Sequence, residues 1–378
     1  MTRKAPATGT IVKVDWPGFI AVTGGLVGLA GGTAAAAAFF KLRRMQRTLA
    51  RVARLKRDSG HLDRVAVVAN PTKHGYVDFK LAAYALCQQL GLGEPIWFET
   101  TRRSPGTRQA REAAALDGVS TVIAAGGDGT VRAVAQGLVG SLVPLGIVPL
   151  GTANLLARNL GLPLVSVRDA LEVAMTGRRR QIDVGRLTAF DAAGAMVLDS
   201  EAFLVISGLG FDAALVSSAD TALKRRLGWP AYFISGFNHL ADKPIKVAVT
   251  LDATDRDPVK RLVDVRSVMF GNCGLLPAGL NLAPDADLTD GLLDLVTAET
   301  RHGLIGWAAV AAQVFLHSFR IRWSPAWASG RLVYRQSDAL QVECATDQLV
   351  QIDGELVGRA ATLKAWVEHL ALSVRVAA

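Results

Sequence analysis

Residues 119–138 read VSTVIAAGGDGTVRAVAQGL, a short apolar run, a glycine-rich turn and a second stretch with helical spacing. The order of these pieces predicts a strand, a tight turn and a helix. At such a junction the free N–H groups and the dipole of the helix favour an anion, and glycine lets the backbone approach it closely. We therefore expect Gly126, Gly127, Gly129 and Thr130 to bind phosphate.

Asp128 is the charged residue of that turn, and its charge has the same sign as that of a phosphate. Its expected use is to hold Mg²⁺ or to order a metal-bound water, because carboxylate oxygens suit this hard cation. An ordinary tight turn is the alternative interpretation.

The pattern of strand, polar turn and helix occurs twice more. The expected strands 64–69 and 145–150 each end in such a turn, and the expected helices are 80–90, 131–138 and 155–159. Strands that alternate with helices predict a doubly wound parallel sheet, with ligands at the carboxyl ends of the strands. A helix cap and a solvated lysine are the alternatives for Thr152 and Lys73. The candidate nucleotide-binding residues in these turns are Asn70, Lys73, Gly151, Thr152, Asn154 and Arg158.

After about residue 183 the chain changes character. Short β-rich segments alternate with turn-forming Asp, Gly and Pro, which predicts a mainly antiparallel second domain. The expected strands are 202–207, 245–251, 262–270, 292–296, 332–335, 340–344 and 349–352.

Asp353-Gly354-Glu355 follows the last of these strands and places two carboxylates around a turn. Transfer of a phosphoryl group to an alcohol needs a carboxylate that accepts the hydroxyl proton. We therefore expect Glu355 to be the catalytic base, with Asp353 and Asp128 as the other catalytic carboxylates. A simple hairpin turn is the alternative, since Asp-Gly is common in such turns.

An apolar stretch of 22 residues without a charge, 19–40, lies near the N-terminus. A helix needs about 20 residues to cross the hydrocarbon layer, so we expect one transmembrane helix. Eight cations follow it within 41–57 and three precede it, and the more basic flank normally stays in the cytoplasm. The expected location is the cytoplasmic membrane, single-pass, with the catalytic domains in the cytoplasm. A cleaved signal peptide and a buried helix of a soluble domain are the alternatives.

The formal net charge of +9 is concentrated in residues 1–57, which carry eleven Lys and Arg and one acid. The rest of the chain holds 31 basic and 32 acidic residues. A nucleic-acid footprint should lie on the folded domain, so nucleic acid is excluded as a partner. The segment 41–57 is expected to lie on anionic headgroups. Glycines at 24, 28 and 32 fit contact between two membrane helices, hence a homodimer, although chance explains them equally well.

The expected organisation of the chain has five parts. They are a short tail (1–18), a transmembrane helix (19–40), a basic juxtamembrane connector (41–63), an α/β nucleotide-binding domain (64–185) and a β-rich lipid-binding and catalytic domain (186–378). Residues 208–213 also match the dinucleotide fingerprint, but no acid follows about 20 residues later to hold a ribose. A nicotinamide oxidoreductase is therefore disfavoured.

These motifs, in this order and spacing, resemble the diacylglycerol kinase catalytic-domain family, which includes bacterial lipid kinases and the sphingosine and ceramide kinases. The resemblance covers about residues 64–375 and is most specific at 126–130 and 149–158. Residues 183–185, 210–212 and 353–355 fall where the family has counterparts. The resemblance implies transfer of the γ-phosphate of ATP to a lipid hydroxyl, in a cleft between an α/β domain and a β-sandwich domain.

ATP and Mg²⁺ are the cofactors that the resemblance implies. Asp128 and Asp183 would organise Mg²⁺ and its waters, while Asn70, Thr152 and Asn154 would bind the nucleotide.

A second metal site is implied at residues 284–292. Asp287, Asp290 and the carbonyl of Leu292 look like the family's separate structural Mg²⁺ site, and spaced oxygen ligands suit this cation. A hydrated acidic turn is the alternative. The chain departs from the family at one position, because several bacterial members carry Asp directly after the Asn of the second loop, where this chain has Leu155.

Three functions are compatible with the sequence. The first is a membrane-anchored lipid kinase acting on diacylglycerol, or else on ceramide or a sphingoid base. The second is a kinase of a soluble substrate such as NAD, which shares the Gly-Gly-Asp-Gly motif. The third is a nucleotide or lipid sensor without turnover, suggested by Leu155. Segments 223–240 and 301–323 mix cations with apolar and aromatic residues, which suits either contact with a membrane or ordinary core helices.

Overall fold

The computed structural model describes residues 64–210, 244–252, 259–276, 279–300, 303–319, 321 and 329–377. The expected membrane helix (19–40), the basic connector (41–63) and segment 223–240 lie outside the described residues. Among the residues that are described, no helix is both long enough and apolar enough to cross a membrane.

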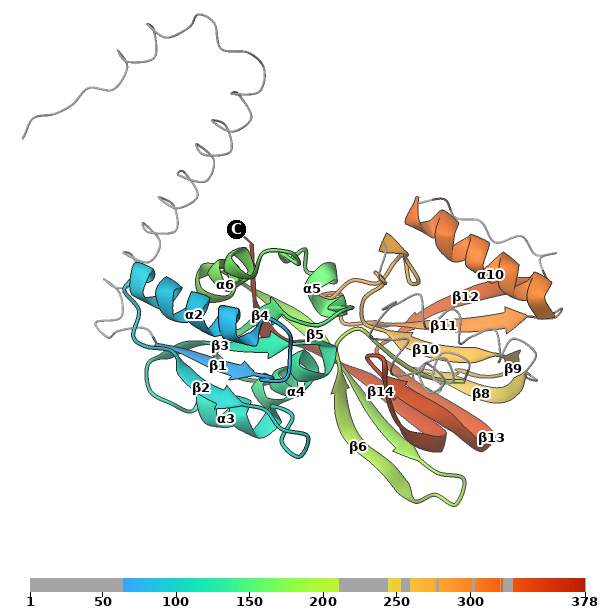
Figure 1. Ribbon diagram of the computed structural model, residues 1–378. Coiled ribbons are helices and arrows are strands. Elements are labelled where there is room, and N and C mark those ends of the chain that lie inside the picture. Colours follow the sequence, from blue (N-terminus) through green and yellow to red (C-terminus); the bar gives the residue numbers. More distant parts are fainter. Residues whose placement is uncertain are drawn as a thin grey trace, which may run out of the picture. The chain divides into compact units, whose positions relative to one another are not determined.

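Residues 64–176 form a parallel sheet with helices on both faces, as expected (Figure 1). The strands lie side by side in the order β4-β3-β1-β2, and all three pairings are parallel. Helices α2 and α6 pack together over one face, and α3 and α4 pack together over the other. The elements are β1 (Arg64–Ala69), α2 (Tyr76–Leu90), β2 (Ile96–Glu99), α3 (Thr107–Ala114), β3 (Val119–Gly126), α4 (Asp128–Leu138), β4 (Leu145–Pro149), α5 (Leu155–Asn159) and α6 (Val167–Thr176).

The central strands are apolar throughout because both faces of the sheet are covered. Every residue from Val65 to Ala69 and from Val122 to Ala125 is fully buried. A strand that is buried on both faces has no polar side, so its sequence reads as a continuous apolar run. This is why the short runs before the glycine turns predict strands.

The second half of the chain is an antiparallel β-sandwich, also as expected (Figure 1). Its described strands pair in the order β12-β11-β10-β7-β13-β14, while β5 and β6 extend from β14, and β8 and β9 extend from β13. The helix α10 (Gly303–Ser318) packs on β11 and β12. The strands are β5 (Arg178–Phe190), β6 (Met196–Phe203), β7 (Ile206–Gly210), β8 (Ile245–Leu251), β9 (Val259–Val265), β10 (Ser267–Gly271), β11 (Leu293–Thr300), β12 (Gly330–Ser337), β13 (Ala339–Ile352) and β14 (Glu355–Val376).

Some expected strands have different limits in the structure. The expected strand 202–207 is divided between β6 and β7, because the N–H groups of Leu204 and Val205 donate to the carboxylate of Asp353 rather than to a neighbouring strand. The expected strand 262–270 is likewise divided, into β9 and β10. The expected strands 340–344 and 349–352 are instead one strand, β13, with an irregularity in its pairing after Glu343.

Strands β5 and β14 join the two halves. β14 pairs with β5 and β13 in antiparallel orientation. Near its end, Val374 pairs with Leu145 of β4 in parallel orientation. The expected division at residue 185 falls inside β5. The hydrogen-bonded sheet is thus continuous from one half to the other.

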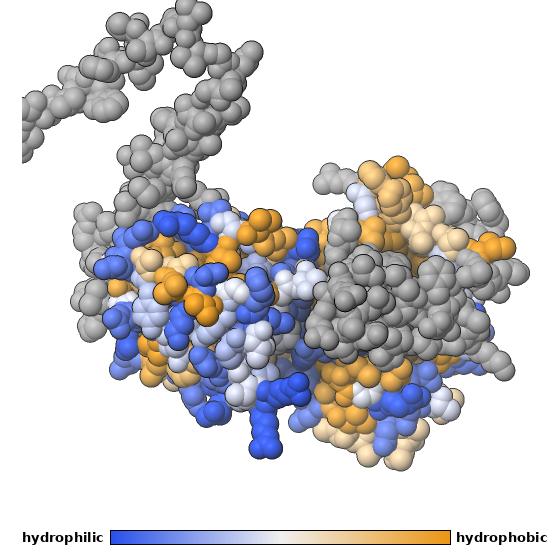
Figure 2. Space-filling view, in the orientation of Figure 1, coloured by the Kyte–Doolittle hydropathy of each residue, from blue (hydrophilic) through white to orange (hydrophobic). Residues whose placement is uncertain are grey.

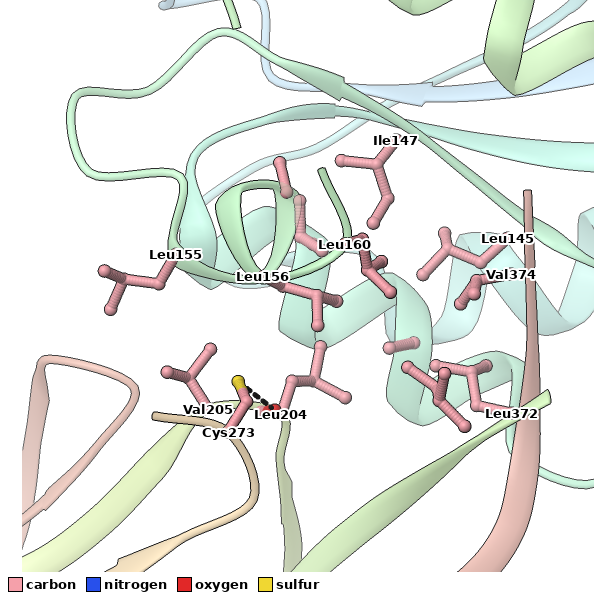
Figure 3. Packing of buried hydrophobic residues seen from close by; sticks show 14 of the residues in the cluster. Leu145, Ile147, Leu155, Leu156, Leu160, Leu204, Val205, Cys273, Leu372 and Val374 are labelled. Atoms are coloured by element: carbon pink, nitrogen blue, oxygen red, sulfur yellow. Dashed lines mark hydrogen bonds between the residues drawn. The ribbon is translucent and has the colours of Figure 1, made fainter. Parts of the chain in front are cut away.

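A single apolar cluster fills the junction between the halves (Figure 3). It brings Leu145 and Leu156 of the α/β half together with Leu204 and Val205 from the link between β6 and β7, and with Val374 of β14. Burial of such side chains contributes roughly 1.5–3 kcal/mol each. The positions of the turns that surround this cluster therefore depend on one shared core.

Leu145→Ala tests this shared core. Leu145 is fully buried, so the substitution should lower the free energy of unfolding by about 2–5 kcal/mol through lost burial and a residual cavity. Leu142→Ala, at a side chain that is 88% exposed, is the matched control and should change it by less than about 0.5 kcal/mol. Urea unfolding of the two variants measures the difference. Equal effects would contradict the assignment of Leu145 to the core.

Candidate functional site

A cleft of about 1190 Å³ opens where the carboxyl ends of β1, β3 and β4 meet the turn between β13 and β14. Many of the residues singled out in the sequence line it. They are Asn70, Lys73, Gly127, Asp128, Gly129, Thr130, Gly151, Thr152, Asp353 and Glu355. The others do not line it, namely Gly126, Asn154, Arg158, Asp183, Asp287, Asp290 and Leu292.

The glycine turns after β3 and β4 touch each other, and this contact requires glycine. A Cβ on Gly151 would lie 2.5 Å from the Cα of Gly127. A Cβ on Gly127 would lie 3.6 Å from the Nζ of Lys73, so the loop after β1 reaches the same point. A Cβ on Gly126 would overlap Thr130 at the start of α4. Three loops thus present backbone and one ammonium group to the same part of the cleft.

Asp128 fastens the two glycine turns together. Its Oδ2 accepts a hydrogen bond from the N–H of Asn154 at 2.9 Å, and its Oδ1 accepts one from the N–H of Leu155 at 2.6 Å. Burial raises the pKa of Asp128 to about 6, although these two N–H groups oppose the shift. The carboxylate is therefore ionised at neutral pH, and each oxygen keeps a lone pair for a further ligand.

Leu155 follows Asn154 directly, at the start of α5. Its N–H completes the hold on Asp128, while its side chain is buried in the apolar cluster of the junction (Figure 3). The side chain of this residue thus contributes packing to the site and no charge.

The side chains of Asn154 and Arg158 make hydrogen bonds within the second loop, and their contact with a nucleotide stays a prediction. The amide of Asn154, a buried residue with φ of 48°, accepts from the N–H of Gly151 at 3.1 Å and donates to its carbonyl at 2.8 Å. The Nε of Arg158 donates to the carbonyl of Ala153 at 2.7 Å. Both side chains are held by their own loop, which leaves the backbone of Gly151 and the side chain of Thr152 to face the cleft.

Asp353 is buried at the point where β13 turns into β14. Its Oδ2 accepts from the N–H of Leu204 at 2.9 Å, and its Oδ1 accepts from the N–H groups of Val205 and Ile206 at 2.9 and 3.0 Å. Burial raises the pKa of Asp353, and the positive charge of Arg132 and these three donors oppose the increase. This carboxylate binds the backbone at the edge of the cleft, and its direct part in catalysis stays a prediction.

Glu355 directly follows the same turn, as the first residue of β14, and lines the cleft. Asp353 and Gly354 both have positive φ, and Ile352 pairs with Glu355, so the two central residues form a tight two-residue hairpin turn. The turn is thus a hairpin, and it carries Glu355 into the cleft, so the hairpin and the catalytic interpretation are compatible. A Cβ on Gly129 would overlap the Glu355 carboxylate, with Oε1 as the nearest atom. The carboxylate therefore lies directly over the start of α4.

Sequence analysis missed Arg132 and Glu201, which also line the cleft. The guanidinium of Arg132 contacts Oε2 of Glu355 at 2.5 Å and Oε2 of Glu201 at 3.8 Å. Helical spacing offered a signal for Arg132, because it lies four residues after Asp128 and so on the same face of α4. Glu201 in β6 carries no comparable signal, since only the tertiary fold brings it to α4.

Asp183 is not among the residues that line the cleft, and its part in organising Mg²⁺ stays a prediction. Its fully buried carboxylate accepts from the N–H groups of Gly291 and Leu370 at 2.7 and 2.6 Å, and Nδ1 of His369 lies 2.9 Å away. Asp183 thus belongs with the loop 284–292 and not with the glycine turns.

The carboxylates of that loop make local hydrogen bonds. Oδ1 of Asp287 accepts from the N–H and hydroxyl of Thr289, and Oδ1 of Asp290 accepts from the N–H of Leu292. Within the part of the chain that the structure describes, no three His, Cys, Asp or Glu side chains are grouped as a metal site. The structural metal site at Asp287, Asp290 and Leu292 stays a prediction.

The fold and the cleft together define a two-domain protein in which glycine turns of a parallel sheet face a carboxylate on a β-sandwich. Comparison with known families identifies the same two parts. Residues 64–187 match the diacylglycerol kinase catalytic domain, and residues 205–375 match the YegS C-terminal NAD kinase beta sandwich-like domain. The chain belongs to the diacylglycerol kinase catalytic-domain family, which confirms the resemblance seen in the sequence.

Individual relatives agree with this assignment. A diacylglycerol kinase of Mycobacterium tuberculosis is 32% identical over 198 residues, which is 51% of this chain and 59% of the relative. A diacylglycerol kinase of Bacillus subtilis is 28% identical over 79% of this chain and 91% of its own length. The chain thus spans less than two thirds of the M. tuberculosis protein. A crystal structure of a diacylglycerol kinase from Bacillus anthracis shares the fold, with a TM-score of 0.62 at 18% identity over 83% of this chain and 97% of that one.

Asp353→Asn tests how far the site depends on the buried carboxylate. Asparagine presents one oxygen and one NH₂ group, so at least one of the three backbone N–H donors would lose its acceptor. We expect the free energy of unfolding to fall by about 1–3 kcal/mol for each donor left unsatisfied.

Asp347→Asn is the control for that substitution. Asp347 is only partly buried and accepts a single backbone N–H, from Ala192, and an asparagine oxygen can replace that acceptor. Denaturant unfolding compares the two variants with the wild type. A loss of stability no larger than that of Asp347→Asn would show that the carboxylate of Asp353 does not hold the link between β6 and β7.

Proposed function

We propose that this protein is an ATP-dependent lipid kinase that transfers the γ-phosphate to a lipid hydroxyl. One observation carries the proposal. The carboxylate of Glu355 lies over Gly129, at the helix start where the glycine turn would hold a phosphate. A proton acceptor beside a phosphate-binding turn is the arrangement that phosphoryl transfer to an alcohol needs.

Each group of residues has a definite part in this proposal. The backbone of Gly127, Gly129 and Gly151 and the ammonium group of Lys73 would bind the phosphates of ATP. Asn70 and Thr152 would contact the nucleotide beside them.

Asp128 would hold Mg²⁺ in the same part of the cleft. One cleft carboxylate with free lone pairs fits this ion, which usually takes one or two carboxylates together with substrate phosphates. Mg²⁺ would supply neutralisation of phosphate charge. Burial of the ionised Asp128 adds to the fit, because a carboxylate that has lost water gains more from a cation.

Glu355 would accept the proton of the acceptor hydroxyl. Its side chain is 54% exposed at the mouth of the cleft, where an acceptor can reach it. Asp353 would act through the backbone, by holding the turn that carries Glu355.

Apolar surfaces support a lipid as the acceptor. The residues that line the cleft include five apolar ones, which suits an acyl chain, namely Leu155, Ile206, Met269, Leu276 and Leu282. We propose diacylglycerol as the first candidate, because the relatives from M. tuberculosis and B. subtilis are named diacylglycerol kinase. Ceramide and sphingoid bases are the alternatives.

The helix α10 provides a second apolar surface. Ile305 and Phe315 on this helix and Phe319 just after it are more than half exposed, and Figure 2 shows hydrophobic residues gathered over α10. The helix carries no Asp, Glu, Lys or Arg, and its His317 is buried against the hydroxyl of Tyr334 at 3.2 Å. An exposed apolar face of this kind is suited to contact with a lipid surface. The transmembrane helix at 19–40, the headgroup contact of 41–57, the cytoplasmic orientation and the homodimer stay predictions from the sequence.

NAD kinase activity is the alternative that one finding favours, because the model matching residues 205–375 is described as NAD kinase-like. A sensor without turnover is the third possibility. Purified full-length protein in mixed micelles, with labelled ATP and Mg²⁺, is therefore offered diacylglycerol, ceramide, sphingosine, polyprenol and NAD. Label in one lipid would support the proposal. Label in NAD alone, or bound ATP with no labelled product, would reject it.

Glu355→Gln should lower kcat about 10²- to 10⁴-fold, which is the usual contribution of a general base. The Km for ATP should change less than about threefold, because the phosphate-binding turns are unaltered. Glu343→Gln is the matched control, since Glu343 also pairs with a cation, Lys260 at 2.8 Å, but lies outside the cleft. Steady-state kinetics with the labelled lipid measures both variants. A Glu355→Gln enzyme with the turnover of the Glu343→Gln enzyme would exclude Glu355 as the base.

A further inference from the structure

Arg132 occupies the centre of a group of carboxylates in the cleft. It lies in α4, and its side chain is only 14% exposed. Nη2 contacts Oε2 of Glu355 at 2.5 Å, and Nη1 lies 3.8 Å from Oε2 of Glu201. Its charge also acts on buried Asp353. The guanidinium is thus the cation that balances three negative side chains at this end of the cleft.

The two oxygens of Glu355 have different surroundings. Oε2 is held by Arg132, whereas Oε1 lies over Gly129 at the start of α4. A glutamate that is half exposed would otherwise exchange among rotamers, because fixing such a side chain costs up to about 2 kcal/mol of conformational entropy. Arg132 is largely buried, so its side chain has less conformational freedom to lose when it holds the glutamate.

We propose that Arg132 is a positioning residue for the phosphoryl transfer, which holds Oε2 of Glu355 and thereby presents Oε1 to the acceptor hydroxyl above Gly129. This inference rests on the proposed function, since it assigns Arg132 to the same reaction. Arg132 acts through Glu355 and does not itself accept or donate the transferred proton. One oxygen of the glutamate serves for fixation and the other for chemistry.

Arginine is suited to this place for a geometric reason. Its planar fork offers separate N–H groups to Glu355 and Glu201, while a lysine offers a single point charge on a flexible stem. Hydrogen bonds between a guanidinium and a carboxylate are also short and strongly directional. Lysine at position 132 should therefore preserve the charge of the cleft but leave the Glu355 carboxylate with more rotational freedom.

A double-mutant cycle tests the proposal. Arg132→Gln should lower kcat about 10- to 100-fold, because a misplacement of about 1 Å costs on the order of 10²-fold, with the Km for ATP changed less than about threefold. In a Glu355→Gln background the same substitution should lower kcat by less than about twofold, because no base remains to be positioned. Arg132→Lys should give an intermediate kcat.

Arg186→Gln is the matched control. Arg186 lies in β5, its side chain is 12% exposed, and its Nη2 pairs with Glu368 at 3.1 Å, so it makes the same kind of ion pair outside the cleft. Arg186→Gln should leave kcat within about twofold of the wild type, while its thermal unfolding reports the cost of losing such a pair. A loss of activity through general weakening of the fold would appear equally in both variants.

The outcomes separate this inference from the proposed function. A wild type that phosphorylates no lipid would reject the proposed function and the inference with it. An active wild type with losses that multiply in the double variant would overturn the inference alone, because Arg132 would then act independently of Glu355. An active wild type with unchanged kcat in Arg132→Gln would also overturn it. If Arg132→Gln does not fold, the cycle with Arg132→Lys decides, and full activity of that variant would overturn the proposal.

Discussion

The buried carboxylate of Asp353 is the interaction on which the geometry of the cleft depends. It binds three successive N–H groups, those of Leu204, Val205 and Ile206, at the link between β6 and β7. These hydrogen bonds separate β6 from β7 along the chain and fix the tight turn beside them. Glu355 lies two residues after Asp353 in the chain. The position of its carboxylate over Gly129 therefore depends on the hydrogen bonds of Asp353. The β-sandwich thus positions a side chain over a helix of the other domain.

Asp128 has the corresponding role in the α/β domain. It links the turn after β3 to the turn after β4 through the N–H groups of Asn154 and Leu155. Glycine at 127 and 151 lets the two turns touch, and the carboxylate holds them in contact. The raised pKa of Asp128, about 6, reflects what burial of this charge costs, and a cation bound at the same carboxylate would offset that cost. The structural and the proposed metal-binding uses of Asp128 are therefore compatible.

The sequence predicted the parallel sheet and most of the cleft, because a short apolar run that ends in a glycine turn is typical of a buried strand followed by a binding loop. It predicted the antiparallel domain from short β-rich segments between turns. It did not predict β5 and β14, whose residues alternate irregularly because each strand has different neighbours along its length. It also did not predict the backbone groups that bind the side chains of Asn154, Arg158 and Asp183. A motif shows which residues are close in the chain, but the backbone groups that bind their side chains are set by tertiary contacts, such as that of Asp183 with Leu370.

The number of backbone N–H groups that donate to each carboxylate separates the acids that stabilise the fold from Glu355. Asp183 accepts two backbone N–H bonds, Asp353 accepts three, and Asp128 accepts two. Glu355 is instead held by a side chain, that of Arg132, through one oxygen only. A backbone donor is fixed by the fold, whereas a guanidinium can be replaced by a single substitution. The acid that we propose to meet the substrate is thus the one whose position is set by a side chain, and its environment can change without loss of the fold.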